Sequence, residues 1–174
     1  MSEQWLTSEQ LATWVRLVAV AELLPGALDS QLRRDAGLTH FEYMVVAMLS
    51  EAPERTLRMT ALAARTNATL SRLSHVVGRL ADRGLVERFP CPQDRRATNA
   101  RLTEAGWQKV VESAPGHVAN VRHHVFEVLS PEQVAQLAGI TDAILDRLDP
   151  DGVMTAPYQR PTPPDDATEP ARPG

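Results

Sequence analysis

The residues best suited to do chemistry in this sequence are polar side chains in the segment 69–83. They are hydroxyls, an imidazole and guanidinium groups: Thr69, Ser71, Arg72, Ser74, His75, Arg79 and Arg83. The apolar residues between them follow the i, i+3, i+4, i+7 spacing of a helix with one buried side: Leu73, Val76, Val77 and Leu80. Small donors on the opposite side of a helix suit entry into the major groove of duplex DNA.

The alternative for this segment is an ordinary solvated helix surface. Such a surface usually mixes Glu with Lys, whereas residues 71–79 contain no acidic side chain. We therefore favour DNA recognition. Within it, we expect Ser71, Arg72, Ser74 and His75 to contact bases, and Arg79 and Arg83 to contact phosphates.

A second group of arginines follows at Asp94-Arg95-Arg96. This triplet lies between two strand-like runs, 85–89 and 97–102, and the residues from Pro90 to Asp94 have turn chemistry. Arginines at the tip of a hairpin suit a narrow, electronegative minor groove. Asp94 is placed to orient one arginine through a bidentate pair.

The charge distribution favours a polyanionic partner although the net charge is −4. Residues 55–109 hold eleven basic and four acidic side chains, a local charge of +7. The rest of the chain holds seven basic and eighteen acidic side chains, a charge of −11. One contiguous third of the chain is thus strongly basic, as expected for a surface that faces nucleic acid.

Helix signals surround this basic segment. A capping box at Thr7 and Gln10 predicts a first helix that Pro25-Gly26 should kink or break and that Gly37 ends. A second box at Thr39 and Glu42 predicts a helix closed by Pro53.

Further helices are expected on both sides of the hairpin. A short helix over 59–66 and a turn at 66–68 precede the segment 69–83, which Gly84 ends. After the hairpin, Thr103 opens a long helix that Pro115-Gly116 should interrupt before it reaches Leu129. A last helix follows Ser130-Pro131 and extends to Leu148.

Three motifs resemble the signature of the MarR family (multiple antibiotic resistance regulators). They are Gly84-Leu85-Val86-Glu87-Arg88, then Asp94-Arg95-Arg96-Ala97, then Leu102-Thr103-Glu104-Ala105-Gly106. The resemblance covers about residues 8–148. It implies a winged helix-turn-helix with 69–83 as recognition helix, 85–102 as wing, and Asp94 and Arg96 as the family's paired wing positions. Arg58, where the family often has a Ser or Thr cap, and Gly78 inside the recognition helix depart from the pattern.

We therefore predict a mainly α fold with a small β-hairpin wing, as a single domain over 1–150. The winged helix-turn-helix takes up about 39–102. The resemblance implies that the terminal helices, about 8–34 and 104–148, form a two-fold dimer. The apolar stripes of the first and last helices support this expectation because such helices need a partner in water. Residues 151–174 hold six of the thirteen prolines and are expected to be a disordered tail.

Other candidate sites have ordinary alternatives. Trp14, His40, Tyr43 and Trp107 are candidates to line an effector pocket, or else are core and interface residues. Cys91, expected to be exposed near Arg88, is a candidate redox thiol, or else a tolerated small residue in a turn. His123-His124 point apart on a helix, so no metal site and no cofactor are expected.

No nucleophile with a base, glycine-rich phosphate loop or paired carboxylates are apparent, so no enzyme is expected. We expect no signal peptide. We also expect no membrane span, because no apolar run approaches the ~18 residues that a span needs. Both expectations favour the cytoplasm. The sequence thus predicts a dimeric regulator that binds a palindromic double-stranded DNA operator, a repressor released by a small-molecule effector. The alternative is a winged-helix module that binds a protein.

Overall fold

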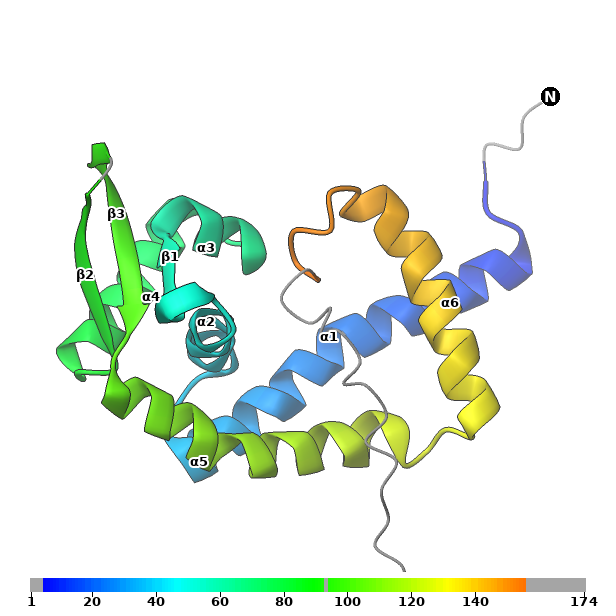
Figure 1. Ribbon diagram of the computed structural model, residues 1–174. Helices are drawn as coiled ribbons and strands as arrows, with labels where there is room; N and C mark the ends of the chain where they lie inside the picture. Colours follow the sequence, from blue (N-terminus) through cyan, green and yellow to red (C-terminus); the bar gives the residue numbers. More distant parts are fainter. Residues whose placement is uncertain (1–4, 93, 156–174) are drawn as a thin grey trace, which may run out of the picture.

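The computed structural model describes residues 5–92 and 94–155, with a compact lobe beside a long helical arm (Figure 1). The helices are α1 (Ser8–Ala36), α2 (His40–Ser50), α3 (Met59–Arg65), α4 (Leu70–Asp82), α5 (Glu104–Val121) and α6 (Pro131–Leu148). The strands are β1 (Thr56–Arg58), β2 (Val86–Cys91) and β3 (Asp94–Leu102). A 3₁₀ turn, η1 (Pro53–Arg55), precedes β1, and a π-helical turn, η2 (Arg122–Phe126), follows α5. The fold is mainly helical with a small winged sheet, as predicted.

The helix starts predicted from capping boxes are confirmed. At α2, the Glu42 backbone N–H donates to Thr39 Oγ1 at 3.0 Å, and the Thr39 N–H donates to Glu42 Oε2 at 2.9 Å. Boxes of the same kind open α1 at Thr7 and α6 at Ser130. These side chains satisfy backbone donors that a helix start leaves without intrahelical partners.

Neither internal proline ends its helix, which excludes the break that was one expectation at Pro25 and corrects the interruption expected at Pro115. α1 continues through Pro25 and α5 continues through Pro115. The two helices run side by side (Figure 1), and Asn120 of α5 donates to the Ala27 carbonyl of α1 at 3.4 Å. Packing between the helices thus overrides the local cost of a missing N–H.

The helix-turn-helix consists of α3, a tight turn and α4, as predicted. Asn67 takes a left-handed φ of 47° in the turn, a conformation that Asn adopts more readily than most residues. The buried Thr66 hydroxyl donates to the Leu62 carbonyl at 2.8 Å, which holds the turn against α3. Thr69 caps α4 by accepting from the Arg72 N–H at 3.2 Å.

The sheet has three antiparallel strands in the order β1-β3-β2, and β1 was not predicted. β2 continues through Pro90 to Cys91, so the hairpin extends beyond the turn expected at Pro90. Pro90 is tolerated because β2 is an edge strand, where a missing N–H breaks no ladder. The longer strands bring the wing tip to the residues between Cys91 and Asp94.

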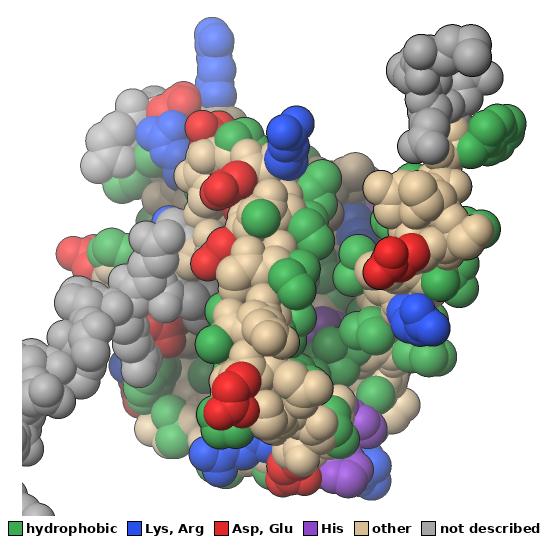
Figure 2. Space-filling model, turned by 90° about the vertical axis from the view of Figure 1, so that its right-hand side faces the viewer, with side chains coloured by type: hydrophobic (Ala, Val, Ile, Leu, Met, Phe, Trp, Pro, Cys, Tyr) green, Lys and Arg blue, Asp and Glu red, His purple; other side chains and the backbone are tan. Residues whose placement is uncertain are grey.

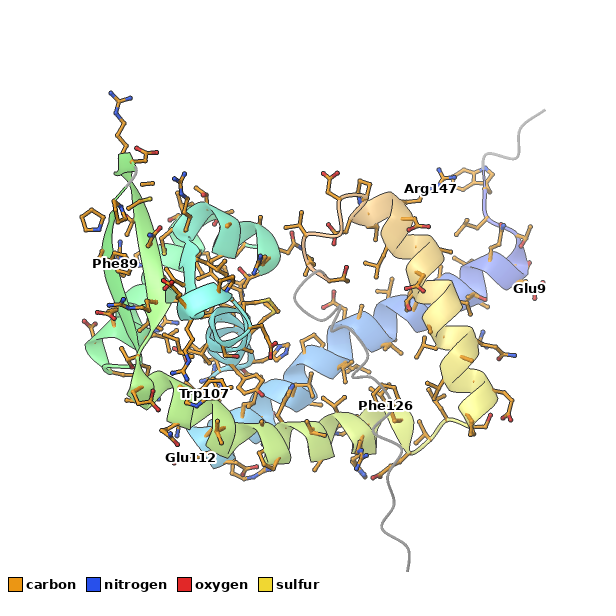
Figure 3. The ribbon with its side chains drawn as sticks, in the orientation of Figure 1. Glu9, Phe89, Trp107, Glu112, Phe126 and Arg147 are labelled. Carbon is orange, nitrogen blue, oxygen red and sulfur yellow. The ribbon has the colours of Figure 1, made fainter. Side chains whose placement is uncertain are left out.

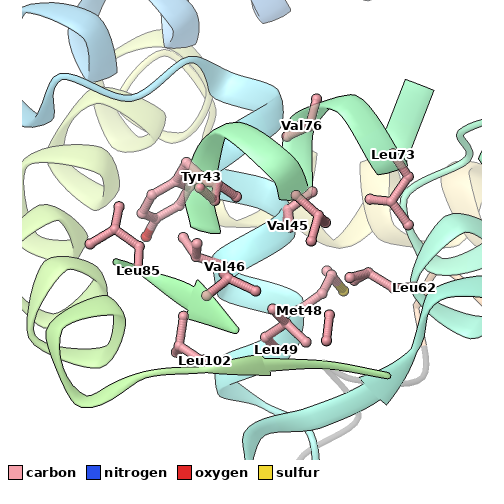
Figure 4. Packing of buried hydrophobic residues seen from close by; sticks show 14 of the residues in the cluster. Tyr43, Val45, Val46, Met48, Leu49, Leu62, Leu73, Val76, Leu85 and Leu102 are labelled. Atoms are coloured by element: carbon pink, nitrogen blue, oxygen red, sulfur yellow. The ribbon is translucent and has the colours of Figure 1, made fainter. Parts of the chain in front are cut away.

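The core lies inside the lobe, beneath α4 and above the sheet (Figure 4). α2 passes through its centre and contributes Tyr43, Val45, Val46, Met48 and Leu49. The apolar stripe of α4 and residues of the sheet complete the cluster: Leu73, Val76, Val77, Leu80, Val86, Ala100 and Leu102. The stripe predicted from spacing is therefore the buried side of α4, which leaves its polar side outward.

The helical arm leaves a broad apolar surface uncovered within the protomer. Figure 2 shows hydrophobic side chains gathered along α6 and the N-terminal half of α1. The large exposed residues on these two helices are Leu11, Trp14, Val15, Leu17, Val20, Leu23, Leu137, Ile140, Ile144 and Leu148. No residue of α6 is buried in the part of the chain that the structure describes.

One helix among the described residues, α1, is long and apolar enough by length and composition to cross a membrane. This corrects the expectation that no such segment exists. The apolar run of α1 is interrupted by the charged residues Arg16 and Glu22, and the last turns of the helix are buried against the lobe, at Leu28, Leu32 and Ala36. That pattern fits a surface which packs against protein.

Gly106 in the first turn of α5 gives a testable prediction about stability. A Cβ added there would lie 2.1 Å from the Leu85 carbonyl oxygen and 2.6 Å from Leu102 Cδ1. We expect Gly106→Ala to lower the free energy of unfolding by about 1–3 kcal/mol, as overpacking does. Denaturant unfolding measures this.

The matched control is Gly78→Ala in α4. A Cβ at Gly78 meets nothing within 4 Å. Alanine there should stabilise the protein by roughly 0.5–1 kcal/mol because it raises helix propensity. Equal stability of the Gly106→Ala variant and the parent protein would show that this close approach does not constrain the junction of wing and arm.

Candidate nucleic-acid interface

The outward side of α4 carries the polar side chains that the sequence singled out. Ser71, Arg72, His75, Arg79 and Arg83 are exposed, and Ser74 is half-buried. At about 3.6 residues per turn, these side chains fall into three rows. Ser71 and His75 form the central ridge, Ser74 lies at the edge toward the wing, and the arginines lie at the edge toward α2.

A groove with a volume of about 150 Å³ joins α4 to the wing. Its lining residues come from α3, α4 and both wing strands: Met59, Thr60, Leu70, Ser74, Arg88, Arg96, Ala97 and Thr98. A hydroxyl of the predicted recognition helix and an arginine of the predicted wing thus face one surface. Arg88 also lines this groove, and sequence reasoning did not assign it to the site.

The described part of the wing tip is held by a backbone bond to Asp94. Asp94 Oδ1 accepts the backbone N–H of Arg96 at 3.1 Å, which closes a tight turn at the start of β3. Among the described side chains no ion pair joins Asp94 to the Arg96 guanidinium group, and the expected pair of Asp94 with Arg95 lies outside them. The Arg95 side chain and Gln93 lie outside the described part of the structure.

The arginines at the other edge of α4 have partners in the first turn of α2. The Arg72 guanidinium lies over the Phe41 ring, 4.1 Å from its centroid. Arg79 Nε donates to Glu42 Oε1 at 3.3 Å, and Arg83 Nη1 lies 3.8 Å from Glu42 Oε2. Sequence reasoning assigned Glu42 only to a capping box, because nothing local in the sequence brings α2 against α4.

Glu42 is ionised in this setting. Its side chain is only 7% exposed, and burial by itself raises the pKa of the carboxyl group. Hydrogen bonds from the Thr39 backbone and from Arg79 outweigh that effect and hold the pKa below its usual value. The result is a buried carboxylate that faces two guanidinium groups.

Cys91 is buried, which corrects the expectation of an exposed thiol. It is 3% exposed, and Arg58 Nη2 donates to its Sγ at 3.5 Å. Arg58 makes no side-chain cap for α3, consistent with its departure from the family pattern. The side chain of Arg58 instead joins the start of α3 to β2.

The four candidate effector-pocket residues are not gathered in one protomer. His40 and Tyr43 both lie beside His117 of α5, with ring centroids 6.4 Å and 4.5 Å away. Trp107 lies at the lobe end of α5 (Figure 3), with Arg55 4.3 Å above its ring. Trp14 is 55% exposed on the arm.

The His40, Tyr43 and His117 cluster contains an unsatisfied polar atom. Among the described residues, the buried His117 Nδ1 has no hydrogen-bond partner. Burial lowers the pKa of both histidines, and the charge of His40 lowers the pKa of His117 further. Two neutral imidazoles at neutral pH can each donate one hydrogen bond and accept another.

Contrary to the expectation that His123 and His124 point apart, their rings contact each other edge to face, with centroids 5.0 Å apart. His123 Nδ1 lies 3.4 Å from Glu127 Oε2. Within the described ranges, no three His, Cys, Asp or Glu side chains come together as metal ligands would.

Known proteins share this fold over most of the chain. A profile of the MarR family matches residues 36–97. Sco3205, a MarR family transcriptional regulator from Streptomyces coelicolor solved in complex with DNA, is 44% identical, with a TM-score of 0.81. The match covers 86% of this chain and 93% of that one. The chain belongs to the MarR family.

Two further MarR-type relatives agree with this assignment. AbsC, a MarR family transcriptional regulator also from Streptomyces coelicolor, is 36% identical over 83% of this chain and 97% of its own, with a TM-score of 0.78. The transcriptional repressor MprA of Escherichia coli is 26% identical over 72% of each chain. The resemblance drawn from the three motifs is therefore confirmed, and the protein is a MarR-family transcriptional regulator.

Proposed function

We propose that this protein regulates transcription by binding a palindromic double-stranded DNA operator as a homodimer. The observation that carries the proposal is the groove that joins Ser74 of α4 to Arg88 and Arg96 of the wing. It lies within the segment of charge +7. A DNA strand in this groove would have the major groove on the α4 side and the minor groove on the wing side.

Each proposed contact has a distinct role. Ser71, Arg72, Ser74 and His75 contact base edges, with Thr69 at the N-terminus of the same helix close to the backbone of the DNA. Arg88 contacts the phosphate that lies between helix and wing. Arg96, oriented by the turn at Asp94, enters the minor groove together with Arg95.

Dimerisation supplies the contacts to the second half-site. The uncovered apolar residues of α1 and α6 are the proposed interface, since contiguous exposed apolar patches mark contact surfaces. The proposed boundaries are an arm over about 8–34 and 104–148, a DNA-binding lobe over about 39–102, and a tail over 151–174. Contrary to the expected disorder, residues 151–155 form a turn in which Asp149 accepts the N–H groups of Val153 and Met154. Residues 156–174 lie outside the described part.

We further propose that the protein is a repressor released by a small molecule, and that it acts in the cytoplasm without catalysis. Of the residues expected from the sequence to line the effector pocket, we keep His40 and Tyr43 and add His117. These three side chains meet between the lobe and the arm. The unsatisfied Nδ1 of His117 supports a polar ligand there. Trp14 remains a candidate only as a residue that a second protomer brings near.

The wing gives a testable prediction. Arg96→Ala should weaken operator binding by about 1–3 kcal/mol for each base or phosphate that the guanidinium touches. The melting temperature should stay nearly unchanged, because Arg96 lies at the tip of the hairpin, outside the core. Titration of labelled operator duplex, alongside thermal unfolding of the same preparation, measures both quantities. Unaltered operator affinity would remove the wing from the mechanism.

The dependence of duplex binding on salt tests the proposed function against a protein-binding winged helix. Binding through phosphates releases counterions, so log K should fall linearly with log[salt], with a slope of about −0.9 per phosphate contacted. Weak binding to every duplex, together with a shallow slope, would instead favour the protein-binding module.

A further inference from the structure

The first turn of α2 holds three arginines of the recognition helix in two different ways. Phe41 offers Arg72 an aromatic ring, which leaves the guanidinium N–H groups available to DNA. Glu42 offers Arg79 and Arg83 a carboxylate, whose negative charge pairs with their positive charges. Of the three arginines, Arg72 is thus open to DNA, whereas Arg79 and Arg83 are paired with Glu42.

Glu42 is fixed in place by bonds that do not depend on DNA. Its backbone N–H and its Oε2 are both held by Thr39 in the capping box of α2. The carboxylate cannot turn away without breaking that box. Its 7% exposure leaves it little access to water, and among the described residues the guanidinium groups of Arg79 and Arg83 lie within 4 Å of its carboxylate oxygens.

The two arginines are held by Glu42 and are also open to solvent. The Arg79 side chain is 56% exposed and that of Arg83 is 39% exposed, so both can reach outward. A DNA phosphate near this edge of α4 would compete with Glu42 for them. A buried carboxylate that must lose its partners resists that exchange, because an unpaired buried charge is unfavourable.

We propose that Glu42 acts as an internal competitor of DNA phosphate and thereby sets the sequence specificity of the recognition helix. By keeping Arg79 and Arg83 on the protein, it removes two positive charges from binding that is independent of sequence. Contacts to bases from Arg72 and its neighbours then form a larger share of the binding free energy. This inference rests on the proposed DNA-binding function and replaces the expectation that Arg79 and Arg83 contact phosphates.

Salt titrations of the parent protein and four variants test the proposal, each on a selected operator and on a random duplex. Glu42→Gln keeps the shape and the capping bond but removes the charge. Its salt slope should steepen by up to about 1.8 per protomer, since two guanidinium groups become available to phosphates. Its affinity for random duplex should rise roughly tenfold, with a smaller change on the operator.

The arginine variants supply the matched comparison. Arg79→Gln/Arg83→Gln keeps donors for Glu42 and should leave the slope at the value of the parent protein. The triple variant Glu42→Gln/Arg79→Gln/Arg83→Gln should return the steepened slope to that value. Arg88→Gln is the positive control, with a slope shallower by about 0.9 per protomer.

Far-UV circular dichroism and denaturant unfolding establish that each variant is folded. If Glu42→Gln does not fold, the double arginine variant alone decides. A slope that becomes shallower in the double variant, or that stays unchanged in a folded Glu42→Gln protein, overturns the competitor role. A parent protein whose duplex binding lacks any salt dependence would contradict the proposed function itself.

Discussion

Removal of residues 131–174 is expected to abolish dimer formation and specific operator binding. The deletion takes away α6, whose apolar residues Leu137, Ile140 and Ile144 remain 37%, 58% and 38% exposed in the protomer. A single winged lobe buries only about 600–1,000 Å² on DNA, so affinity should fall by about 10³-fold or more, to the non-specific level.

A shorter deletion is the matched control. Removal of 151–174 leaves α6 whole and, within the described residues, takes away only the turn in which Asp149 accepts the N–H groups of Val153 and Met154. That protein should remain a DNA-binding dimer. Sedimentation of both truncations decides between the outcomes, and a folded monomer that still binds the operator after the longer deletion would refute the dimer.

Ile140→Asp tests the same surface without shortening the chain. Ile140 is 58% exposed, so a carboxylate there leaves the protomer core intact. A two-fold dimer interface would bury two such carboxylates, one from each protomer, and each would lose its hydration. We expect a folded monomer by circular dichroism and sedimentation, with operator affinity reduced to the same extent as in the longer deletion.

Arg72→Ala is expected to have the second largest effect, a loss of sequence preference. A good bidentate contact to a base discriminates by about 1–3 kcal/mol, and a two-fold dimer makes the contact twice, so about 2–6 kcal/mol is at stake. Phe41 orients the guanidinium by stacking at 4.1 Å, so the arginine is positioned before DNA arrives.

Arg72→Lys separates charge from geometry at this position. Lysine keeps the positive charge but lacks the planar fork that contacts two atoms of one base. Sequence preference should fall in both variants, whereas the salt slope should stay near the parent value in the lysine variant. Measured affinities for the operator and for duplexes altered at one base pair test this. Preference retained in both variants would assign base recognition to other residues.

Much of the fold followed from local signals. The capping boxes at Thr39 and Ser130 mark helix starts because they satisfy backbone donors a few residues away. Gly37 and Gly84 mark helix ends because they take φ angles of 64° and 71°. The apolar stripe of α4 predicted its buried side for the same reason, since helical spacing is itself local.

The features that sequence did not predict depend on contacts between distant segments. β1 forms because β3 offers it an edge, and its three residues carry no strand signal of their own. Pro25 and Pro115 stay helical because α1 and α5 pack together. Cys91 is buried because β2 continues past Pro90.

The same limit applied to the candidate site. The polar residues of α4 and the wing were found from the sequence because their types and order are distinctive. The partners Phe41 and Glu42 were not, because 37 residues separate Glu42 from Arg79. His117 was missed as well, since only the packing of α5 against α2 brings it beside Tyr43.

Selection of bound fragments from a pool of random duplex DNA tests the central claim most directly. The full-length protein should enrich a palindrome whose half-sites lie about one helical turn, roughly 10 base pairs, apart, as two recognition helices related by a two-fold axis require. Enrichment of no sequence over the starting pool, or of a single motif without a symmetric partner, would contradict a dimeric, sequence-specific regulator.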